Sequence, residues 1–229
     1  QALAQSILGN LAVYGLLTCL AELKADDGES LLDRAQVSSE NFSMEHKVDT
    51  LGERRPTSLD AYFAGDYRVA IECKLTEADV GACSHAHKGE GCDGNYSCKG
   101  VGRERCPLTE RGVLYWRYVP SLFGWHSDSD YLPCPLDARY QLVRNVLAVG
   151  VDVNGTVSRE SGHVVLLYDE RNPAFRAGGR GLAAYEDTKE ALLEPSMLRS
   201  CSWQRIVEKM RRKELLPWLT EHLAHKYGL

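Results

Sequence analysis

Two carboxylates and one lysine in this sequence stand at a spacing that could bring them together around a divalent metal ion. Asp60 is followed, after eleven residues, by Glu72-Cys73-Lys74. Carboxylate oxygens are preferred ligands of Mg²⁺ and also suit Mn²⁺, and a neighbouring lysine can stabilise negative charge that develops in a transition state. Burying a carboxylate and an ammonium in an apolar strand is costly unless the charges are paired or bound to a metal. These residues therefore predict a divalent-metal site with a cation beside it.

The three residues belong to a predicted β-hairpin. Residues 58–75 form two stretches with strand-like apolar alternation, separated by turn residues. Pairing of Phe63 with Val69 would set Asp60 opposite Glu72, because the register continues along both strands. Alternating side-chain direction places Glu72 and the lysine two residues later on one face of their strand. The hairpin therefore predicts that all three polar side chains converge on one patch.

This arrangement resembles the PD-(D/E)xK nuclease superfamily, although Leu59, not proline, precedes Asp60. The segments IECKLTE and YQLVRN, with a YW pair between them, also resemble bacterial restriction-endonuclease-like proteins of this superfamily. The resemblance implies metal-assisted hydrolysis of DNA phosphodiester bonds. Asp60, Glu72 and the Cys73 backbone carbonyl would hold Mg²⁺, and Lys74 would orient the attacking water or offset the charge of the transition state.

The resemblance also implies roles for residues outside the hairpin. Many members carry a further acidic residue before the motif, and Glu45, fifteen residues ahead of Asp60, matches that place, with Glu40 as its competitor. Such a residue can hold a second metal or orient a metal-bound water. In related nucleases a later helix brings a Gln, or a Gln with an Arg, to the DNA phosphate, which implies this role for Gln141 and Arg144. A solvated polar position is the alternative for each of them.

The length and composition are those of an ordinary globular protein, with 229 residues of which 44% are hydrophobic and 26% charged. We expect one α/β domain over residues 1–229, with a restriction-endonuclease-like core in which helices flank a central mixed β-sheet. Residues 82–112 are rich in Cys and Gly and predict an insertion. The apolar patterns predict helices over 1–24, 136–147, 182–193 and 203–227, and strands over 42–48, 148–153 and 163–168.

Cysteine and histidine residues in and after the insertion predict a second metal site, because thiolates and imidazoles suit zinc. Their spacing matches no standard zinc knuckle, and two Cys-Pro steps resemble those found at iron–sulfur ligands. Metal-free reduced thiols, zinc and an iron–sulfur cluster all remain open. The candidate ligands are Cys83, Cys98, Cys106 and Cys134, and Cys92, His85 and His87 lie among them in the sequence.

The formal net charge of −5 argues against general electrostatic coating of nucleic acid. Two stretches are locally basic, with net charges of +3 over residues 99–117 and +5 over residues 199–213, and either can contact DNA or form a solvated face. Polar residues interrupt the apolar N-terminal run, so we expect a cytoplasmic protein without a membrane partner. A homodimer stays open. The alternative functions are a non-catalytic nucleic-acid-binding module on the same fold, or an interaction domain stabilised by zinc or an iron–sulfur cluster.

Overall fold

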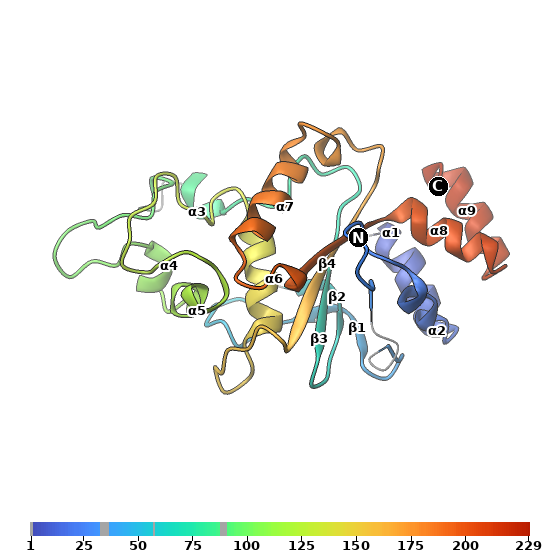
Figure 1. The fold of residues 1–229 in the computed structure, drawn as a ribbon, viewed down its shortest axis with the longest axis horizontal. Coiled ribbons are helices and arrows are strands. Elements are labelled where there is room, and N and C mark those ends of the chain that lie inside the picture. The colour runs from blue at the N-terminus through green and yellow to red at the C-terminus, as the bar shows by residue number, and fades with distance from the viewer. Residues whose placement is uncertain (1, 33–36, 57, 88–90) are drawn as a thin grey trace.

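A five-stranded β-sheet lies at the centre of the protein, and helices cover both of its faces (Figure 1). The structure is a computed structural model and describes residues 2–32, 37–56, 58–87 and 91–229. The strand order is β1-β2-β3-β4-β5. β2 pairs antiparallel with both β1 and β3, whereas β4 runs parallel to both β3 and β5. This mixed sheet between helical layers confirms the predicted α/β class.

Helical segments precede β1, the strands β1 to β3 follow one another directly, and helices separate β3 from β4 and β4 from β5. The strands are β1 (Phe42–Lys47), β2 (Ser58–Phe63), β3 (Arg68–Cys73), β4 (Gly162–Tyr168) and β5 (Leu198–Ser202). The helices are α1 (Ala2–Ala4), a π-helical turn (Gln5–Gly9), α2 (Asn10–Val13), α3 (Ser84–His87), α4 (Pro107–Glu110), α5 (Tyr115–Leu122), α6 (Tyr140–Gly150), α7 (Arg180–Ala191), α8 (Trp203–Arg212) and α9 (Pro217–Tyr227). Short 3₁₀ turns occupy Leu17–Glu22, Pro173–Phe175 and Pro195–Met197.

The two faces of the sheet contact two separate hydrophobic clusters. On one face, β3 packs through Val69 and Ile71 against the N-terminal helical segment and the C-terminal helices α8 and α9. On the other face, Ala70 lies against α5 and α6. This division follows from the alternation of side chains along a strand. Glu72 and Lys74 lie on the α6 side of the sheet, as the alternation predicts.

The structure confirms the predicted hairpin register. β2 and β3 pair Phe63 with Val69, Tyr62 with Ala70 and Ala61 with Ile71. Continuing this register by one step places Asp60 across from Glu72. The two carboxylates are therefore neighbours on adjacent strands.

Several predicted bounds were wrong. The helix predicted over 1–24 ends at Val13 and is followed by a separate 3₁₀ turn, and the helix predicted over 203–227 is divided into α8 and α9. The apolar run over 148–153 was predicted to be a strand, but α6 continues through Gly150. A helix that is buried on every side has no polar face, so periodicity alone cannot distinguish its apolar sequence from that of a buried strand. The predicted start of this helix at residue 136 was also early, because the regular helix begins at Tyr140. The short strand β5, which contains two serines, was not predicted.

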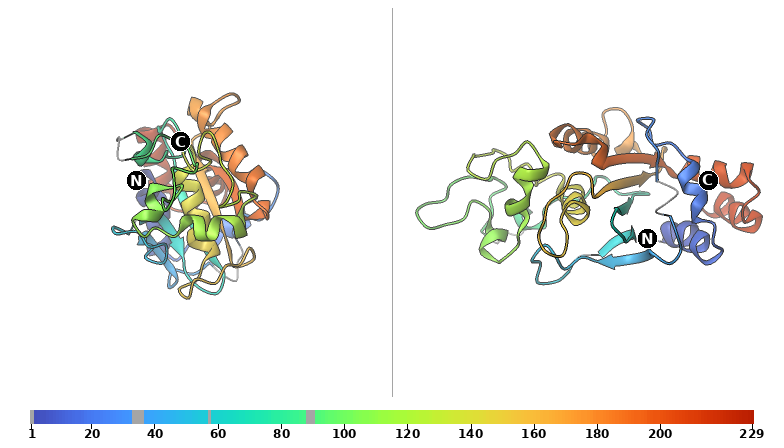
Figure 2. Two further views of the ribbon diagram at one scale, coloured as in Figure 1. Left: turned by 90° about the vertical axis from the view of Figure 1, so that its left-hand side faces the viewer. Right: turned by 60° about the horizontal axis from the view of Figure 1, so that its bottom comes forward.

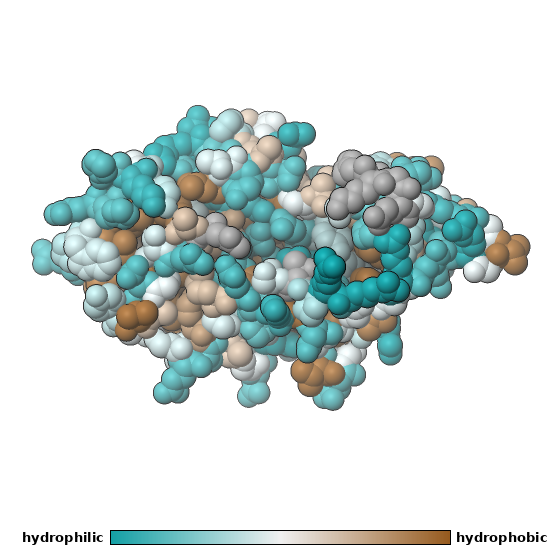
Figure 3. Space-filling view, turned by 180° about the vertical axis from the view of Figure 1, so that it is seen from behind, coloured by the Kyte–Doolittle hydropathy of each residue, from teal (hydrophilic) through white to brown (hydrophobic). Residues whose placement is uncertain are grey.

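The insertion and the chain ends lie at opposite ends of the molecule (Figure 2). The predicted insertion at 82–112 contains α3 and α4 joined by long irregular segments, and its residues 88–90 lie outside the described part of the chain. Viewed from behind, the surface is mostly hydrophilic, with small scattered hydrophobic areas (Figure 3). Among the helices that the structure describes, none has the length and apolar character needed to span a membrane.

Candidate functional site

Asp60, near the start of β2, lies beside Glu72 and Lys74 at the end of β3, as the hairpin predicts. The Cys73 backbone N–H donates a 2.8 Å hydrogen bond to Asp60 Oδ2, which locks the Asp60 side chain onto the neighbouring strand. Glu72 and Lys74 are 4% and 6% exposed, respectively. Glu72 and Lys74 are thus nearly excluded from water beside the partly buried Asp60. Electrostatic interactions between such buried groups are stronger than in water.

Lys74 is held by two acceptors. Its Nζ lies 2.9 Å from Glu72 Oε1 and donates a 2.7 Å hydrogen bond to Gln141 Oε1. Gln141 belongs to the first turn of α6. The side chain that the resemblance assigned to a DNA phosphate therefore positions the lysine in this structure.

Asn145, a residue of α6 that the sequence pattern did not indicate, also anchors Glu72. Asn145 Nδ2 donates a 2.8 Å hydrogen bond to Glu72 Oε2, so both oxygens of this carboxylate have partners. Arg144 is 4% exposed, and its guanidinium donates to Asn145 Oδ1 at 2.9 Å. Arg144 therefore supports the site from behind and does not reach the surface, where a phosphate would lie. The i, i+4 spacing of Gln141 and Asn145 is the signal that could have identified the pair.

The electrostatics around Asp60 match the needs of a bound cation. Burial, followed by the charge of Glu72, raises the pKa of the Asp60 carboxyl, while the Cys73 N–H and Lys74 lower it less. Two neighbouring carboxylates repel each other in a poorly solvated site, and a divalent cation between them would relieve that repulsion. The oxygen donors present are of the type that Mg²⁺ prefers. Asp60 and Glu72 therefore fit the metal that the motif implies.

The Cys73 backbone is placed where the motif requires it. The N–H and C=O groups of one strand residue point to the same side, and the Cys73 N–H points to Asp60. Its carbonyl oxygen therefore also faces β2, on the side where Asp60 lies. This geometry is consistent with the carbonyl as a third oxygen donor.

Glu45 lies on β1, the strand next to β2 in the sheet. The pairing of Met44 with Ala61 and of His46 with Leu59 leaves Glu45 across from Asp60 on β1. Its backbone has φ = 52°, a left-handed value that is uncommon outside glycine. Glu45 is exposed and accepts a 3.4 Å hydrogen bond from Gln5 Nε2. Within the described residues, no hydrogen bond or ion pair joins Glu45 to Asp60, Glu72 or Lys74. Glu40, the competing acidic residue, is likewise exposed.

The contact between Gly81 and Gln141 provides a test of lysine positioning. Gly81 has φ = 93°, and a Cβ at this position would lie 2.0 Å from Gln141 Oε1. We expect Gly81→Ala to push Gln141 away from Lys74 and to reduce activity by about 10- to 100-fold, as losses of supporting residues typically do. The measurement is the rate at which the purified variant performs the DNA cleavage that the resemblance implies.

The matched control is Gly112→Ala. Gly112 has a similar φ of 89°, but a Cβ there meets nothing within 4 Å. Both variants carry the cost of alanine in a left-handed conformation, about 1–2 kcal/mol, and only the first displaces Gln141. Equal rates for the two variants would show that Gln141 does not position Lys74.

The four candidate cysteine ligands do not all lie together. Cys83, Cys106 and Cys134 line one cavity beside the start of α6, and the fourth cysteine on its wall is Cys92. Cys98, which was predicted to complete the set, is exposed and does not line this cavity. Its backbone N–H instead donates to Asp130 Oδ1 at 3.2 Å, which holds this part of the insertion away from the cavity. The geometry thus replaces Cys98 by Cys92.

Comparison with protein families gives one match that spans almost the whole chain. The description of that family is restriction endonuclease associating with ARP, and the match covers residues 1–228. Comparisons with curated proteins and with solved structures find no match. The motif residues Asp60, Glu72 and Lys74 lie within the matched range. The geometry of the site and the extent of this match agree: the chain belongs to the restriction endonuclease family associating with ARP.

Proposed function

We propose that this protein is a Mg²⁺-dependent nuclease that hydrolyses DNA phosphodiester bonds. The observation that carries the proposal is the convergence of Asp60, Glu72 and Lys74, supported from α6 by Gln141 and Asn145. An exposed Glu–Lys pair on an ordinary hairpin would need none of this support. Membership of a restriction endonuclease family agrees with the proposal.

Each residue has a defined role in the proposed reaction. Asp60, Glu72 and the Cys73 carbonyl would hold the metal. The metal, when bound, would make a water more acidic and neutralise charge on the phosphate. Lys74 would place its ammonium against the oxygen that gains negative charge. Gln141 restricts the motion of Lys74, and Asn145 fixes the orientation of Glu72, so neither group needs to reorganise during the reaction.

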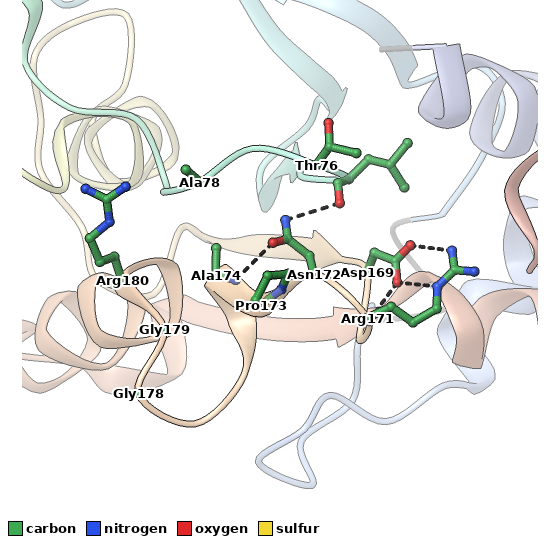
Figure 4. Close-up of a pocket in the computed structure, with 11 residues that line it drawn as sticks. Thr76, Ala78, Asp169, Arg171, Asn172, Pro173, Ala174, Gly178, Gly179 and Arg180 are labelled. Atoms are coloured by element: carbon green, nitrogen blue, oxygen red, sulfur yellow. Dashed lines mark hydrogen bonds and ion pairs between the residues drawn. The ribbon is translucent and has the colours of Figure 1, made fainter.

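A groove beside the site has the size and chemistry to hold part of a nucleic-acid strand. Its volume is about 770 Å³, and its walls include Leu75, Thr76 and Ala78, which follow Lys74 in the chain, and the loop that precedes α7 (Figure 4). Asn172 Nδ2 fixes one wall by donating to the carbonyl oxygens of Leu75 and Glu77. The exposed Arg180 points toward the side of the groove on which Ala78 lies.

The other basic side chain in the groove is already paired. Arg171 Nη2 lies 2.6 Å from Asp169 Oδ2, and its second Nη donates to the Gly228 carbonyl. Arg180, by contrast, has no ion pair among the described residues. A phosphate in the groove would therefore contact Arg180 in preference to Arg171.

The direct test uses purified protein with supercoiled and linear DNA, in Mg²⁺ and in excess chelator. We expect nicking or cutting in Mg²⁺ and none in chelator. Binding of DNA without cleavage under either condition would favour the non-catalytic module and overturn the proposed chemistry. The family description also names ARP, and we include association with such a partner in the proposal. Repeating the assay with that partner would show whether it changes the rate or the choice of DNA.

A further inference from the structure

Four cysteines from three separate stretches of chain converge on one enclosed cavity. Cys83 lies at the start of the insertion, Cys92 and Cys106 lie within it, and Cys134 lies after it, and all four line the same space. The volume of this cavity is about 20 Å³. A cavity volume of roughly 10–15 Å³ is enough for one water molecule. The cavity therefore has room for a single water molecule or a single metal ion.

Backbone hydrogen bonds hold these stretches together without the cysteine side chains. The Cys134 N–H donates to the Gly94 carbonyl at 2.8 Å, two residues from Cys92. The Cys83 N–H donates to the Asp137 carbonyl at 2.7 Å. Tyr96 and Tyr131 exchange a further pair of backbone bonds between the same two stretches. The fold thus brings the segments of Cys83, Cys92 and Cys134 together independently of their side-chain orientations.

The thiols are close enough to influence one another electrostatically. Burial raises the pKa of the Cys134 thiol to about 12, and the neighbouring Cys106, Cys83 and Cys92 add to that rise. Burial likewise raises the pKa of Cys106, to which Cys83 and Cys92 contribute. No disulfide joins any of these cysteines.

We infer that Cys83, Cys92, Cys106 and Cys134 bind one Zn²⁺ ion. Four thiolates are a standard ligand set for structural zinc. The cavity of about 20 Å³ has room for one small ion, so it favours a single zinc over a larger cluster. His85 also lines the cavity, but its Nδ1 lies 3.2 Å from an Arg111 nitrogen, and a neighbouring guanidinium disfavours a second cation there.

Binding requires the thiols to turn toward one point. Within the described residues, no three His, Cys, Asp or Glu side chains already have their donor atoms arranged for one ion. Rotation about χ1 moves only the sulfur atom of a cysteine, and three staggered positions are accessible at each one. The backbone, which is the harder part to arrange, already holds the segments of Cys83, Cys92 and Cys134 together. Arg105, next to Cys106, donates a 3.0 Å hydrogen bond to Asp130 Oδ1 and so ties the fourth segment to the others.

The insertion has a structural reason to use a metal. In its described residues the insertion has two four-residue helices as regular elements, and the irregular segments described there offer little apolar surface to bury. A metal can supply the stability that a small hydrophobic core cannot. The cavity wall also includes Tyr140, the residue before Gln141. Zinc at this place would therefore steady the start of the helix that positions Lys74.

The test is the metal content of the full-length protein, purified from zinc-supplemented medium without chelator. We expect about one zinc per chain by elemental analysis, and a clear loss of zinc in Cys92→Ser. Cys98→Ser is the matched control, because Cys98 lies six residues further along the same insertion but is exposed. We expect this control to keep its zinc. Neither measurement depends on cleavage, so failure of the nuclease proposal would leave this result unaffected.

A second measurement covers the case in which Cys92→Ser does not fold. Wild-type protein exchanged into Co²⁺ should show the intense near-ultraviolet absorption of thiolate-to-cobalt charge transfer, together with the visible bands of a tetrahedral site. Absence of stoichiometric zinc and of this spectrum would overturn the inference. Equal zinc loss in both serine variants would also overturn it, and so would a brown protein that contains iron and sulfide.

Discussion

Replacing Asp60 by asparagine is expected to abolish DNA cleavage while leaving the protein at least as stable as the wild type. Asparagine keeps the shape of the side chain and can still accept the hydrogen bond from the Cys73 N–H. It removes one of the two carboxylates that would hold the metal. We expect a loss of activity on the order of 10³-fold or more, because removal of a single charge-stabilising group can cost that much.

The stability of this variant follows from the pKa of Asp60. Burial and the Glu72 charge raise the Asp60 pKa from its ordinary value of 3.8, so the charged form is less favourable in the folded than in the unfolded chain. Such a group stabilises the fold fully below its unfolded pKa, and this contribution is lost as the pH rises through the folded pKa. At neutral pH the Asp60 charge therefore opposes folding. Asparagine removes that opposition, so we expect an unchanged or higher Tm.

Three measurements check this prediction together. The first is the rate of plasmid nicking, with Asp66→Asn as the control, because Asp66 is an exposed acid in the turn of the same hairpin. The second is the Tm of each variant with and without Mg²⁺. Bound Mg²⁺ should raise the Tm of the wild type and of Asp66→Asn, but not that of Asp60→Asn. The third is the unfolding free energy, in which the advantage of Asp60→Asn should shrink as the pH falls toward about 4.

Nicking at the wild-type rate by Asp60→Asn would remove the basis of the metal site. A loss of Tm at neutral pH would contradict the electrostatic argument separately, because it would mean that the Asp60 charge stabilises the fold. The two readouts therefore test the chemistry and the electrostatics independently.

Replacing Lys74 by methionine is expected to lower both activity and stability. Lys74 is 6% exposed, and its ammonium is the ion-pair partner of the buried Glu72. Methionine fills a similar space but leaves Glu72 without that partner in a dry site. Breaking a buried ion pair in this way costs about 3–5 kcal/mol. We expect a loss near the low end of that range, because Asn145 still donates to Glu72, and cleavage below detection.

The double variant Lys74→Met/Glu72→Gln separates the two effects. With both charges removed, no uncompensated buried charge remains, so we expect most of the unfolding free energy to return. Cleavage should stay undetectable. Denaturant unfolding of the wild type, both single variants and the double variant completes a double-mutant cycle, with the exposed Lys47→Met as the control for loss of a lysine. Additive losses in this cycle would show that Lys74 and Glu72 are not coupled.

The local features of the site could be predicted from sequence because they depend on near neighbours. The alternation along residues 68–73 and the turn before it determine the hairpin, its register and the meeting of Asp60 with Glu72. The spacing of the acidic residues and the lysine then indicates the chemistry. All of these contacts lie within about fifteen residues of chain, where strand geometry alone constrains the positions.

The supporting contacts could not be predicted in the same way, because they join residues far apart in sequence. Gln141 reaches Lys74 across 67 positions and Asn145 reaches Glu72 across 73. The sequence pointed to Gln141 and Arg144 as a surface pair, whereas the packing of α6 on the sheet buries Arg144 and turns Asn145 inward.

The four cysteines of the proposed zinc site could not be selected from sequence for the same reason. Only the path of the insertion places Cys92 at the cavity and leaves Cys98 in solvent. The sequence by itself determined the α/β class, the hairpin and its acid–acid–lysine motif, since these follow from side-chain periodicity over short distances. Tertiary structure decided which distant groups complete each site, because that depends on how whole elements pack and on which side chains lose contact with water.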